Sequence, residues 1–492
     1  MKILLATSEV YPYSKTGGLA DMVAALAKTL ARQGHEVGVV TPLYGSIREN
    51  YPEIKKMEWV LELPLDWHQI QGGVYYLNVD KGLTYYFIEQ EEFFDRPGIY
   101  QHEGKDYPDN PERFIFFSKA VAHLAQFLPW RPDLVHVHDW QTALVPLLLK
   151  HSQGIGLLDR SIPTCLTIHN LAYQGVSPAK IFALTNLPWV YFSPASTEFY
   201  GNFNFLKSGI VFADRLTTVS PAYAKEIMSA EYGANLNGVL SQRSNVLSGI
   251  LNGADYEVWN TSDNPALQYP YTQRNMAVGK AQNKELLQQT MGLKRNRKIP
   301  LFANIGRMAD QKGMDIMIPV MEDMLAGDIQ FICLGNGSDR YEGAARELQK
   351  RFPHKVGLFV GYNAELAHQI TAGSDFFLMP SRYEPCGLNQ MYSLRYGTLP
   401  IVRATGGLKD TVIDLDESND EANGFKFTTY ASQDLARTMI RALSVYYSAA
   451  VFRNMRKNAM QADFSWEQTA RHYEEVYKAA LQGAGFVGKE SA

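Results

Sequence analysis

The same order of local patterns occurs twice along this chain. A short apolar run, a glycine-containing turn with a basic residue, an amphipathic helix and a second apolar run follow one another, first from KILLATSEV to EVGVVTPLY and again from PLFANIGRM to IQFICLG. A strand, a helix and a second parallel strand form the repeating unit of doubly wound α/β sheets. The pattern therefore predicts an α/β chain with one doubly wound parallel sheet in each half.

Further apolar runs extend both sheets. They lie at 134–138, 164–169, 215–220 and 245–251 in the first half, and at 356–362, 375–381 and 399–404 in the second. The polar stretch 255–298 is interpreted as the connection between the halves, and 463–481 has the pattern of a helix. We expect an N-terminal domain at 1–253 and a C-terminal domain at 254–466, with the terminal helical segment 467–492 completing the first domain.

Composition excludes several classes of protein. Of 492 residues, 46% are apolar and 20% are charged, which is typical of a globular chain and not of a disordered one. A formal net charge of −4 gives no general attraction to nucleic acid or to an anionic membrane. MKILLATSEV lacks a signal-peptide core, and no window reaches the roughly 18 apolar residues of a membrane span. We expect neither a nucleic-acid partner nor a membrane partner.

Glycine turns with cations follow apolar runs in both halves, at Lys15–Gly18 and at Gly306–Lys312. In parallel sheets, ligands gather beyond the carboxyl ends of the strands, where helix N-termini favour anions. Lys15, Arg307 and Lys312 are therefore candidate ligands of a phosphate group. Neither turn matches GxGxxG or GxxxxGK[ST], so a dinucleotide or P-loop site is weakly supported. A tight turn with a solvated lysine is the alternative at Lys15.

Two more turns in the second half have the same character, SRYEPCGLN at 381–389 and Thr405-Gly406-Gly407. The backbone amides of Gly387 and Leu388 are expected to face a phosphate. A carboxylate at Glu384 could hydrogen-bond sugar hydroxyls or stabilise positive charge that develops at an anomeric carbon. The backbone amides and the carboxylate of these turns are therefore candidates to contact a phosphate and a sugar.

Eight segments in sequence order resemble the bacterial glycogen synthase and plant starch synthase family: KTGGLAD (15–21), HDWQTAL (138–144), HNLAYQG (169–175), NFLKSGI (204–210), NGADYEVWN (252–260), GRMADQKG (306–313), SRYEPCGL (381–388) and TGGLKDTV (405–412). The resemblance implies the GT-B fold, in which two Rossmann-like domains face a central cleft. It also implies a glucosyltransferase that extends α-1,4-glucan or maltooligosaccharide acceptors from ADP-glucose with retention of anomeric configuration. A bacterial cytoplasm or, for a processed plant form, the plastid stroma is the implied compartment.

The resemblance also implies roles for single residues. The diphosphate is bound by Lys15 and Gly18 from the first domain and by Arg307, Lys312, Gly387 and Leu388 from the second. The transferred glucose is held by Glu384, Asp139, His169 and Asn170. Asn252 is a further hydrogen-bonding residue near the hinge, Tyr362 stacks on adenine, and Cys386, Thr405 and Gly406 belong to the substrate-binding turns. Ala254 stands where the family often has Ile, which is a change of packing.

A mechanism follows from these groups. The glycosyl–phosphate bond breaks with oxocarbenium character, so the cations stabilise charge on the departing diphosphate and no metal or other cofactor is required. Retention without an evident nucleophile indicates attack by the acceptor hydroxyl on the same face. The alternatives are a paired-carboxylate hydrolase, a GT-B transferase that uses UDP-glucose or another acceptor, and a catalytically silent glucan-binding relative.

Other patterns are given structural interpretations. Asp414-Leu415-Asp416 has the form of a metal-binding motif, but a solvated acidic loop is preferred, and His136 with His138 lacks a third metal ligand. The three cysteines have no CxxC spacing, so neither a disulfide framework nor a zinc site is expected, and Cys386 is interpreted as a close-packed thiol. The aromatic segment 196–209, with Phe203, is an open candidate for acceptor binding.

Overall fold

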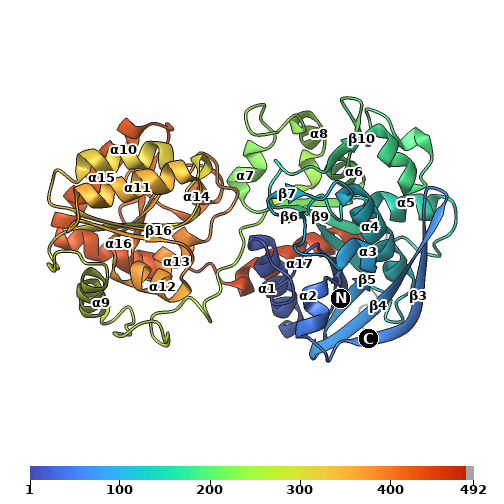
Figure 1. Ribbon diagram of the computed structural model, residues 1–492, viewed down its shortest axis with the longest axis horizontal. Helices are drawn as coiled ribbons and strands as arrows, with labels where there is room; N and C mark the ends of the chain where they lie inside the picture. The colour runs from blue at the N-terminus through green and yellow to red at the C-terminus, as the bar shows by residue number, and fades with distance from the viewer. Residues whose placement is uncertain (484–492) are drawn as a thin grey trace. The chain divides into compact units, whose positions relative to one another are not determined.

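The computed structural model describes residues 1–483, which form two compact units (Figure 1). Unit 1 consists of Met1–Val219, Ala224–Gly253 and the segment from Trp466 onward, and unit 2 consists of Ser220–Tyr223 and Ala254–Ser465. Each unit has its own sheet with helices on both faces. Among the described residues, no helix is long and apolar enough to cross a membrane.

The main sheet of unit 1 has the strand order β14-β13-β9-β8-β1-β2-β5-β4-β3. All neighbours from β14 to β5 pair in parallel; this was predicted for every one of these strands except β5, which was not expected from the sequence. The strands are β1 Lys2–Ala6, β2 Glu36–Pro42, β3 Lys55–Leu65, β4 His68–Asp80, β5 Leu83–Glu89, β8 Leu134–His138, β9 Thr164–Ile168, β13 Arg215–Thr218 and β14 Leu247–Gly249. Short strands lie outside it: β6 Gln101–His102, β7 Lys105–Asp106, β10 Val176–Pro178, β11 Glu198–Phe199 and β12 Asn202–Asn204.

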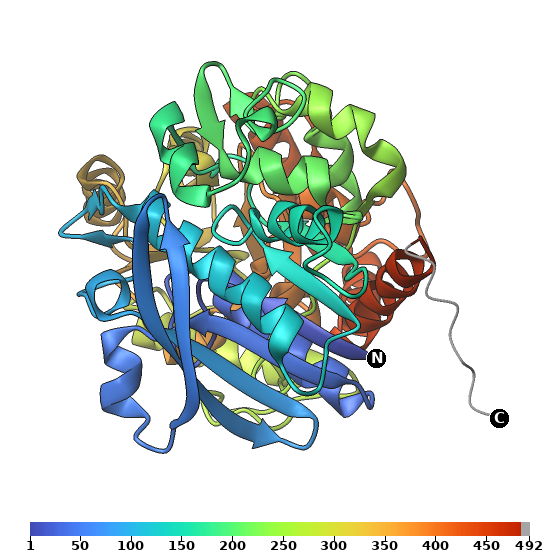
Figure 2. The same ribbon diagram turned by 90° about the vertical axis from the view of Figure 1, so that its right-hand side faces the viewer.

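The prediction of a purely parallel sheet is wrong at one edge of unit 1. Strands β3 and β4 form a long antiparallel hairpin that pairs with β5, visible in blue in Figure 2. The hairpin has one exposed face, and its alternating exposed and buried residues give no continuous apolar run. A search for the apolar runs of buried parallel strands therefore passes over it.

The helices of unit 1 cover both faces of its sheet. They are α1 Gly18–Arg32, α2 Gly45–Asn50, α3 Glu91–Phe94, α4 Asn110–Phe127, α5 Val145–Gly154, α6 Phe205–Phe212, α8 Asn237–Gln242 and α17 Trp466–Gly483, with short 3-10 turns η1 Ala179–Thr185, η2 Trp189–Tyr191 and η3 Ser244–Val246. Helix α7, Pro221–Glu226, begins in the short segment assigned to unit 2.

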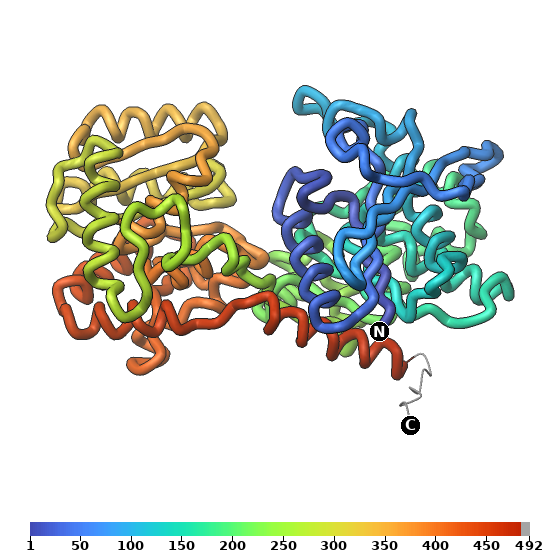
Figure 3. Tube along the Cα trace, turned by 90° about the horizontal axis from the view of Figure 1, so that it is seen from below, coloured from blue at the N-terminus to red at the C-terminus, as the bar shows by residue number. Residues whose placement is uncertain are grey.

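Helix α17 brings the end of the chain back to the first unit, where it lies beside α1 (Figure 3). The hydroxyl of Tyr477 lies 2.8 Å from His136 Nδ1 at the centre of the sheet, and Thr469 donates to the carbonyl of Leu251 at 2.9 Å. Tyr473 and Tyr477 are fully buried. The helix is therefore part of the core of unit 1; the rest of the predicted segment 467–492 lies outside the described residues.

Unit 2 has the strand order β17-β16-β15-β18-β19-β20, with every pair parallel. Its strands are β15 Leu301–Ile305, β16 Gln330–Gly335, β17 Val356–Val360, β18 Phe376–Met379, β19 Leu399–Arg403 and β20 Phe425–Phe427. Its helices are α9 Met276–Thr290, α10 Met314–Met324, α11 Asp339–Arg351, α12 Ala364–Gly373, α13 Asn389–Arg395, α14 Gly406–Thr411, α15 Ser432–Tyr447 and α16 Ala449–Gln461, with the 3-10 turn η4 Asp310–Lys312.

The stretch 255–298 is more than the predicted connection. Tyr271 is buried and donates to the carbonyl of Tyr396 at 2.8 Å, while Asn264 donates to the hydroxyl of the same tyrosine at 3.0 Å. Helix α9 packs along α12. The segment looks polar because several of its polar side chains, such as Lys280 and Lys284, are buried with partners, so composition alone hides its place inside unit 2.

Candidate functional site

The turn at the start of α1 is held by a carboxylate that follows β1. Glu9 is 4% exposed and accepts from the backbone N–H groups of Thr16 and, at 3.3 Å, Gly17, and also from the Thr16 hydroxyl at 3.0 Å. Glu9 was not among the predicted site residues, although an acidic residue three positions after a buried strand is a usable signal. This carboxylate fixes the backbone of the predicted anion-binding turn.

Open space lies beside the glycines of this turn. A Cβ placed on Gly17 or Gly18 would meet no atom within 4 Å. Packing therefore does not require glycine there, whereas close approach of a ligand to the backbone would. Lys15 is half exposed and forms an ion pair of 2.7 Å with Asp21, so it lies beside the N-terminus of α1.

A second group of predicted residues follows β8 and β9, which are neighbours in the sheet. Asp139 has φ 55°, in the left-handed region, and its Oδ1 accepts from the backbone N–H of His169 at 2.8 Å. His169 Nε2 lies 3.1 Å from His138 Nδ1. The structure thus brings Asp139, His169 and Asn170 together, because their strands end side by side at the same edge.

Burial sets the charge of these groups. It raises the pKa of the Asp139 carboxyl to about 7, although backbone hydrogen bonds from His169 and Asn170 oppose the shift. Burial also lowers the pKa of His169 to about 3, so its imidazole is neutral at neutral pH. His169 can therefore donate or accept a hydrogen bond but does not supply a positive charge.

The histidines considered as metal ligands have other partners. His136 contacts Tyr477 and, at 2.6 Å, the hydroxyl of Thr167, and burial lowers its pKa to about 3. Within residues 1–483, no group of three or more His, Cys, Asp and Glu side chains is placed to hold a metal ion.

Asn252 lies at the end of the second segment of unit 1, Ala224–Gly253. Its Oδ1 is buried and has no hydrogen-bond partner among the described residues. An unsatisfied acceptor of this kind is costly unless a ligand or water donates to it. This favours the predicted hydrogen-bonding role of Asn252.

In unit 2, the loop after β15 positions both predicted cations. Lys312 Nζ donates to Glu384 Oε2 at 2.6 Å, and Ser381 donates to the same oxygen at 3.0 Å. Arg307 is exposed and donates to Gln311 Oε1 at 2.8 Å. Glu384 is 6% exposed, so its charge is compensated chiefly by Lys312. A cation and a carboxylate thus meet at the carboxyl end of the sheet.

The turn that carries Glu384 rests on the glycines before α14. Gly406 has φ 46°, and a Cβ there would lie 2.0 Å from the carbonyl oxygen of Glu384. The N–H of Gly407 donates to that same oxygen at 3.2 Å. Thr405 and Gly406 are both buried. These residues therefore support the turn, and glycine is required at 406 by conformation as well as by space.

The remaining predicted residues surround this turn. Gly387 has φ 71°, Leu388 precedes the short helix α13, and Asn389 donates to the carbonyl of Ile305 at 2.8 Å, which joins α13 to the end of β15. Cys386 is 5% exposed and is not in a disulfide. Tyr362 follows β17 and is 88% exposed, so its ring is accessible.

The structure narrows one open candidate and corrects one interpretation. Phe203 is fully buried and packs against Phe182 and Phe205, so its ring cannot bind an acceptor directly. Asp414 does not belong to a solvated loop: it is 3% exposed and Arg441 binds both of its carboxylate oxygens, at 2.6 and 3.0 Å. Local composition does not reveal tertiary contacts such as these.

Comparison with known proteins identifies the chain's relatives. Residues 2–242 match the model of the starch synthase catalytic domain, and residues 289–461 match that of glycosyl transferases group 1. The chain is 43% identical to the glycogen synthase of Anaeromyxobacter sp. strain Fw109-5, over 97% of this chain and 99% of that protein. It is 42% identical to the glycogen synthase of Geobacillus thermodenitrificans, over 98% of each.

A solved structure agrees over the whole fold. The catalytic domain of starch synthase IV from Arabidopsis thaliana, bound to ADP and acarbose, matches with a TM-score of 0.86 and 32% identity, over 98% of this chain and 99% of that one. This match confirms the GT-B fold. The chain therefore belongs to the glycogen and starch synthase family of glycosyltransferases.

Proposed function

We propose that this glycogen synthase relative transfers glucose from ADP-glucose to the non-reducing-end 4-hydroxyl of an α-1,4-glucan, with retention of anomeric configuration. The observation that carries the proposal is the Lys312–Glu384 pair at the turn after β18, which Gly406 supports. The chain is similar to a starch synthase that was solved with ADP and acarbose. The bacterial relatives favour a bacterial cytoplasm as its compartment.

The cations stabilise the diphosphate of the donor. As the bond between the anomeric carbon and the phosphate oxygen breaks, negative charge accumulates on the diphosphate. Arg307 and Lys312 stabilise that charge in unit 2, and Lys15 with the open backbone at Gly18 supplies the contribution of unit 1. Since these fixed charges neutralise the leaving group, we propose that the reaction needs no metal ion; an activity that depends on added divalent cations would contradict this part.

The transferred glucose is held by carboxylates and neutral polar groups. Glu384 accepts hydrogen bonds from sugar hydroxyls while it holds Lys312 in place. Asp139 and His169 act together, because the carboxylate of Asp139 fixes the backbone N–H of His169. Tyr362, whose ring is exposed, stacks on the adenine. Asn252 offers its unsatisfied carbonyl oxygen to a donor on the ligand.

Retention is explained by attack on the face that the leaving group vacates. The acceptor's 4-hydroxyl oxygen forms a bond to the anomeric carbon, the bond to the phosphate oxygen breaks, and the hydroxyl proton moves to the departing phosphate. No carboxylate forms a covalent bond to the sugar in this sequence. A glucosyl-enzyme trapped on Glu384 or Asp139 would contradict it.

Donor kinetics test the proposal. With a maltooligosaccharide acceptor, we expect kcat/KM for ADP-glucose to exceed that for UDP-glucose by at least tenfold, an order-of-magnitude threshold that corresponds to about 1.4 kcal/mol of discrimination. Equal or reversed preference would indicate the UDP-glucose alternative. Glucan binding without transfer from either donor would indicate a silent relative.

A further inference from the structure

A basic cavity of about 610 Å³ lies in unit 2, away from the residues described above. Asp375, which lines it, comes immediately before β18 and accepts from the N–H of Leu301 at the start of β15 at 2.9 Å. Ser381 and Glu384 follow the opposite end of β18. At about 3.3 Å per residue, the two ends of this sheet are on the order of 15 Å apart. The cavity is therefore a separate site.

The wall of the cavity carries far more positive than negative charge. Six basic residues and one acidic residue line it: Lys280, Lys284, Arg297, Lys298, Arg453 and Arg456, with Asp375. The chain as a whole has a net charge of −4, so this excess is local. Outside the lining, Glu285 pairs with Arg297 at 2.5 Å. When Glu285 is counted together with Asp375, the basic side chains at the cavity still outnumber the acidic ones.

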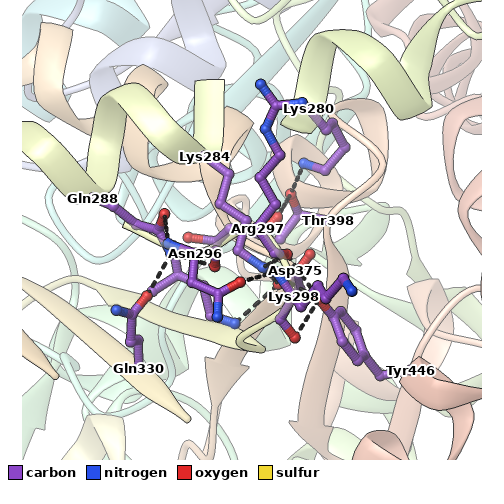
Figure 4. A network of polar contacts seen from close by, with 12 residues as sticks. Lys280, Lys284, Gln288, Asn296, Arg297, Lys298, Gln330, Asp375, Thr398 and Tyr446 are labelled. Carbon is purple, nitrogen blue, oxygen red and sulfur yellow. Dashed lines mark hydrogen bonds and ion pairs between the residues drawn. The ribbon is translucent and has the colours of Figure 1, made fainter. Parts of the chain in front are cut away.

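The innermost cations are buried, and most of their N–H groups donate to oxygen atoms of the protein (Figure 4). Lys284 Nζ and Arg456 Nη2 bind the two oxygens of Asp375, at 2.5 and 2.7 Å. Lys280 Nζ donates to the carbonyl of Ala372 at 2.8 Å and the hydroxyl of Thr398 at 2.6 Å. Two cations thus share one carboxylate, and the third, Lys280, is held by neutral oxygens.

Arg456 keeps an unused donor. Its Nε is buried without a hydrogen-bond partner in the described part of the chain, and its side chain is 12% exposed. A buried guanidinium N–H without an acceptor is costly, and an oxygen that reached this Nε would relieve that cost.

The outer cations are accessible to a ligand. Lys298 and Arg453 are exposed, and the structure records no ion pair for either side chain within residues 1–483. Tyr447, which is 69% exposed, stands beside them as an apolar surface. Cations at two depths with an acceptor-seeking Nε suit a compact dianion rather than a single carboxylate, because two negative charges compensate the excess more fully.

We propose that this cavity binds the phosphate group of a small phosphorylated molecule, at a second site distinct from that of the donor nucleotide. The outer residues Lys298 and Arg453 attract the dianion, and the Nε of Arg456 donates to one of its oxygens. The network of Lys284, Asp375 and Arg456 joins α9, β18 and α16, so a bound phosphate stabilises unit 2.

Burial has a further consequence for the lysines. Desolvation lowers the pKa of Lys280 well below its usual value and also lowers that of Lys284, while Asp375 opposes both shifts. A dianion nearby would raise these pKa values again, because it favours the charged form of each lysine.

The test uses the full-length protein with saturating ADP, so that the nucleotide site is filled. Inorganic phosphate and glucose 1-phosphate are titrated at constant ionic strength, with chloride as the control anion. The variant Lys298→Ser/Arg453→Ser removes the two unpaired outer cations and keeps the buried network. Arg346→Ser/Lys350→Ser, on the exposed face of α11, removes the same charge elsewhere in unit 2.

We expect saturable binding of both probes, weakened at least tenfold, about 1.4 kcal/mol, in the first variant and unchanged in the second. If glucose 1-phosphate binds more tightly than inorganic phosphate, the sugar also contacts the protein. If the two bind equally, the phosphate group alone accounts for the affinity. Either result supports the phosphate site. Absence of saturable binding, or equal binding by both variants, overturns it. Loss of transfer in Arg307→Ala with phosphate binding retained separates this site from the donor site.

Discussion

Arg307 offers the cleanest test of a single charge. It is exposed and its recorded partner is Gln311, so Arg307→Ala should change the free energy of unfolding by no more than about 0.5 kcal/mol. If it stabilises charge that develops on the diphosphate, kcat should fall about 100-fold, or ~3 kcal/mol of barrier. Steady-state kinetics with ADP-glucose measures this, and Arg346→Ala is the control. A rise in KM with unchanged kcat would assign Arg307 to ground-state binding.

Asp139 makes stability depend on pH. Its carboxyl pKa is raised to about 7 in the folded protein, against about 3.9 when unfolded. Between these values the unfolded state loses its proton first, so the contribution of Asp139 is greatest at low pH and is lost as pH rises towards 7. Asp139→Asn should remove this loss and keep the acceptor for the His169 N–H.

We therefore expect the stability of Asp139→Asn relative to the wild type to rise between pH 5 and pH 8, by on the order of 2 kcal/mol. Thermal unfolding of both proteins at several pH values measures the difference. A difference that stays constant with pH would show that Asp139 ionises normally. Because the residue is assigned to glucose binding, transfer activity should fall in the same variant.

Gly406 connects a backbone requirement to the site. A Cβ there would collide with the carbonyl of Glu384, and φ 46° disfavours any side chain. Gly406→Ala should lower stability by about 2 kcal/mol and lower kcat as the Glu384 turn moves. Gly343→Ala, in α11 where a Cβ meets nothing within 4 Å, is the control and should be neutral or stabilising by up to about 1 kcal/mol. Equal changes in stability and kcat in the two variants would show that Gly406 does not support the Glu384 turn.

At the scale of elements, the turn before α1 depends on Glu9. Without its carboxylate, the N–H groups of Thr16 and Gly17 lose their acceptor, and the turn must be ordered when the donor binds. Ordering one or two residues costs about 1–2 kcal/mol each, so Glu9→Ala should raise KM for ADP-glucose on the order of tenfold. Glu9→Gln, which keeps one acceptor oxygen, should show a smaller effect. Unchanged KM in both variants would mean that the turn is ordered without Glu9.

Elements with a strong periodic pattern were predictable, and those shaped by tertiary contacts were not. The parallel strands of both units other than β5 and β20, and helices α1 and α10, follow from apolar runs and helical spacing. The β3–β4 hairpin was missed because only alternate residues are buried, and the segment before α9 because its polar residues are satisfied inside unit 2.

The site shows the same division. Lys312, Glu384 and Gly406 follow recognisable turns, and the structure brings them together. The position of Glu9 soon after a buried strand marks it as a candidate, but its hydrogen bonds to the turn are seen only in the structure, and the burial of Phe203 depends on η1 packing over it. Residue identity therefore suggested the chemistry, while the supporting contacts required three-dimensional structure.

At the scale of the whole molecule, the chain contains two doubly wound units, each with polar turns at the carboxyl end of its parallel strands. Unit 1 contributes a backbone-lined turn and the Asp139–His169 group, and unit 2 contributes the Lys312–Glu384 pair. The proposal gives both units a part in one reaction, in which charge on a departing diphosphate is neutralised while glucose moves to a glucan.

The most direct test is the product of a single transfer. Wild-type protein is incubated with ¹³C-labelled ADP-glucose and a maltooligosaccharide, and the new glycosidic bond is identified by NMR and by digestion with linkage-specific glucosidases. We predict one labelled glucose joined by an α-1,4 bond at the non-reducing end, with release of ADP. A β-linked product, free labelled glucose as the main product, or no transfer from ADP-glucose would contradict the account.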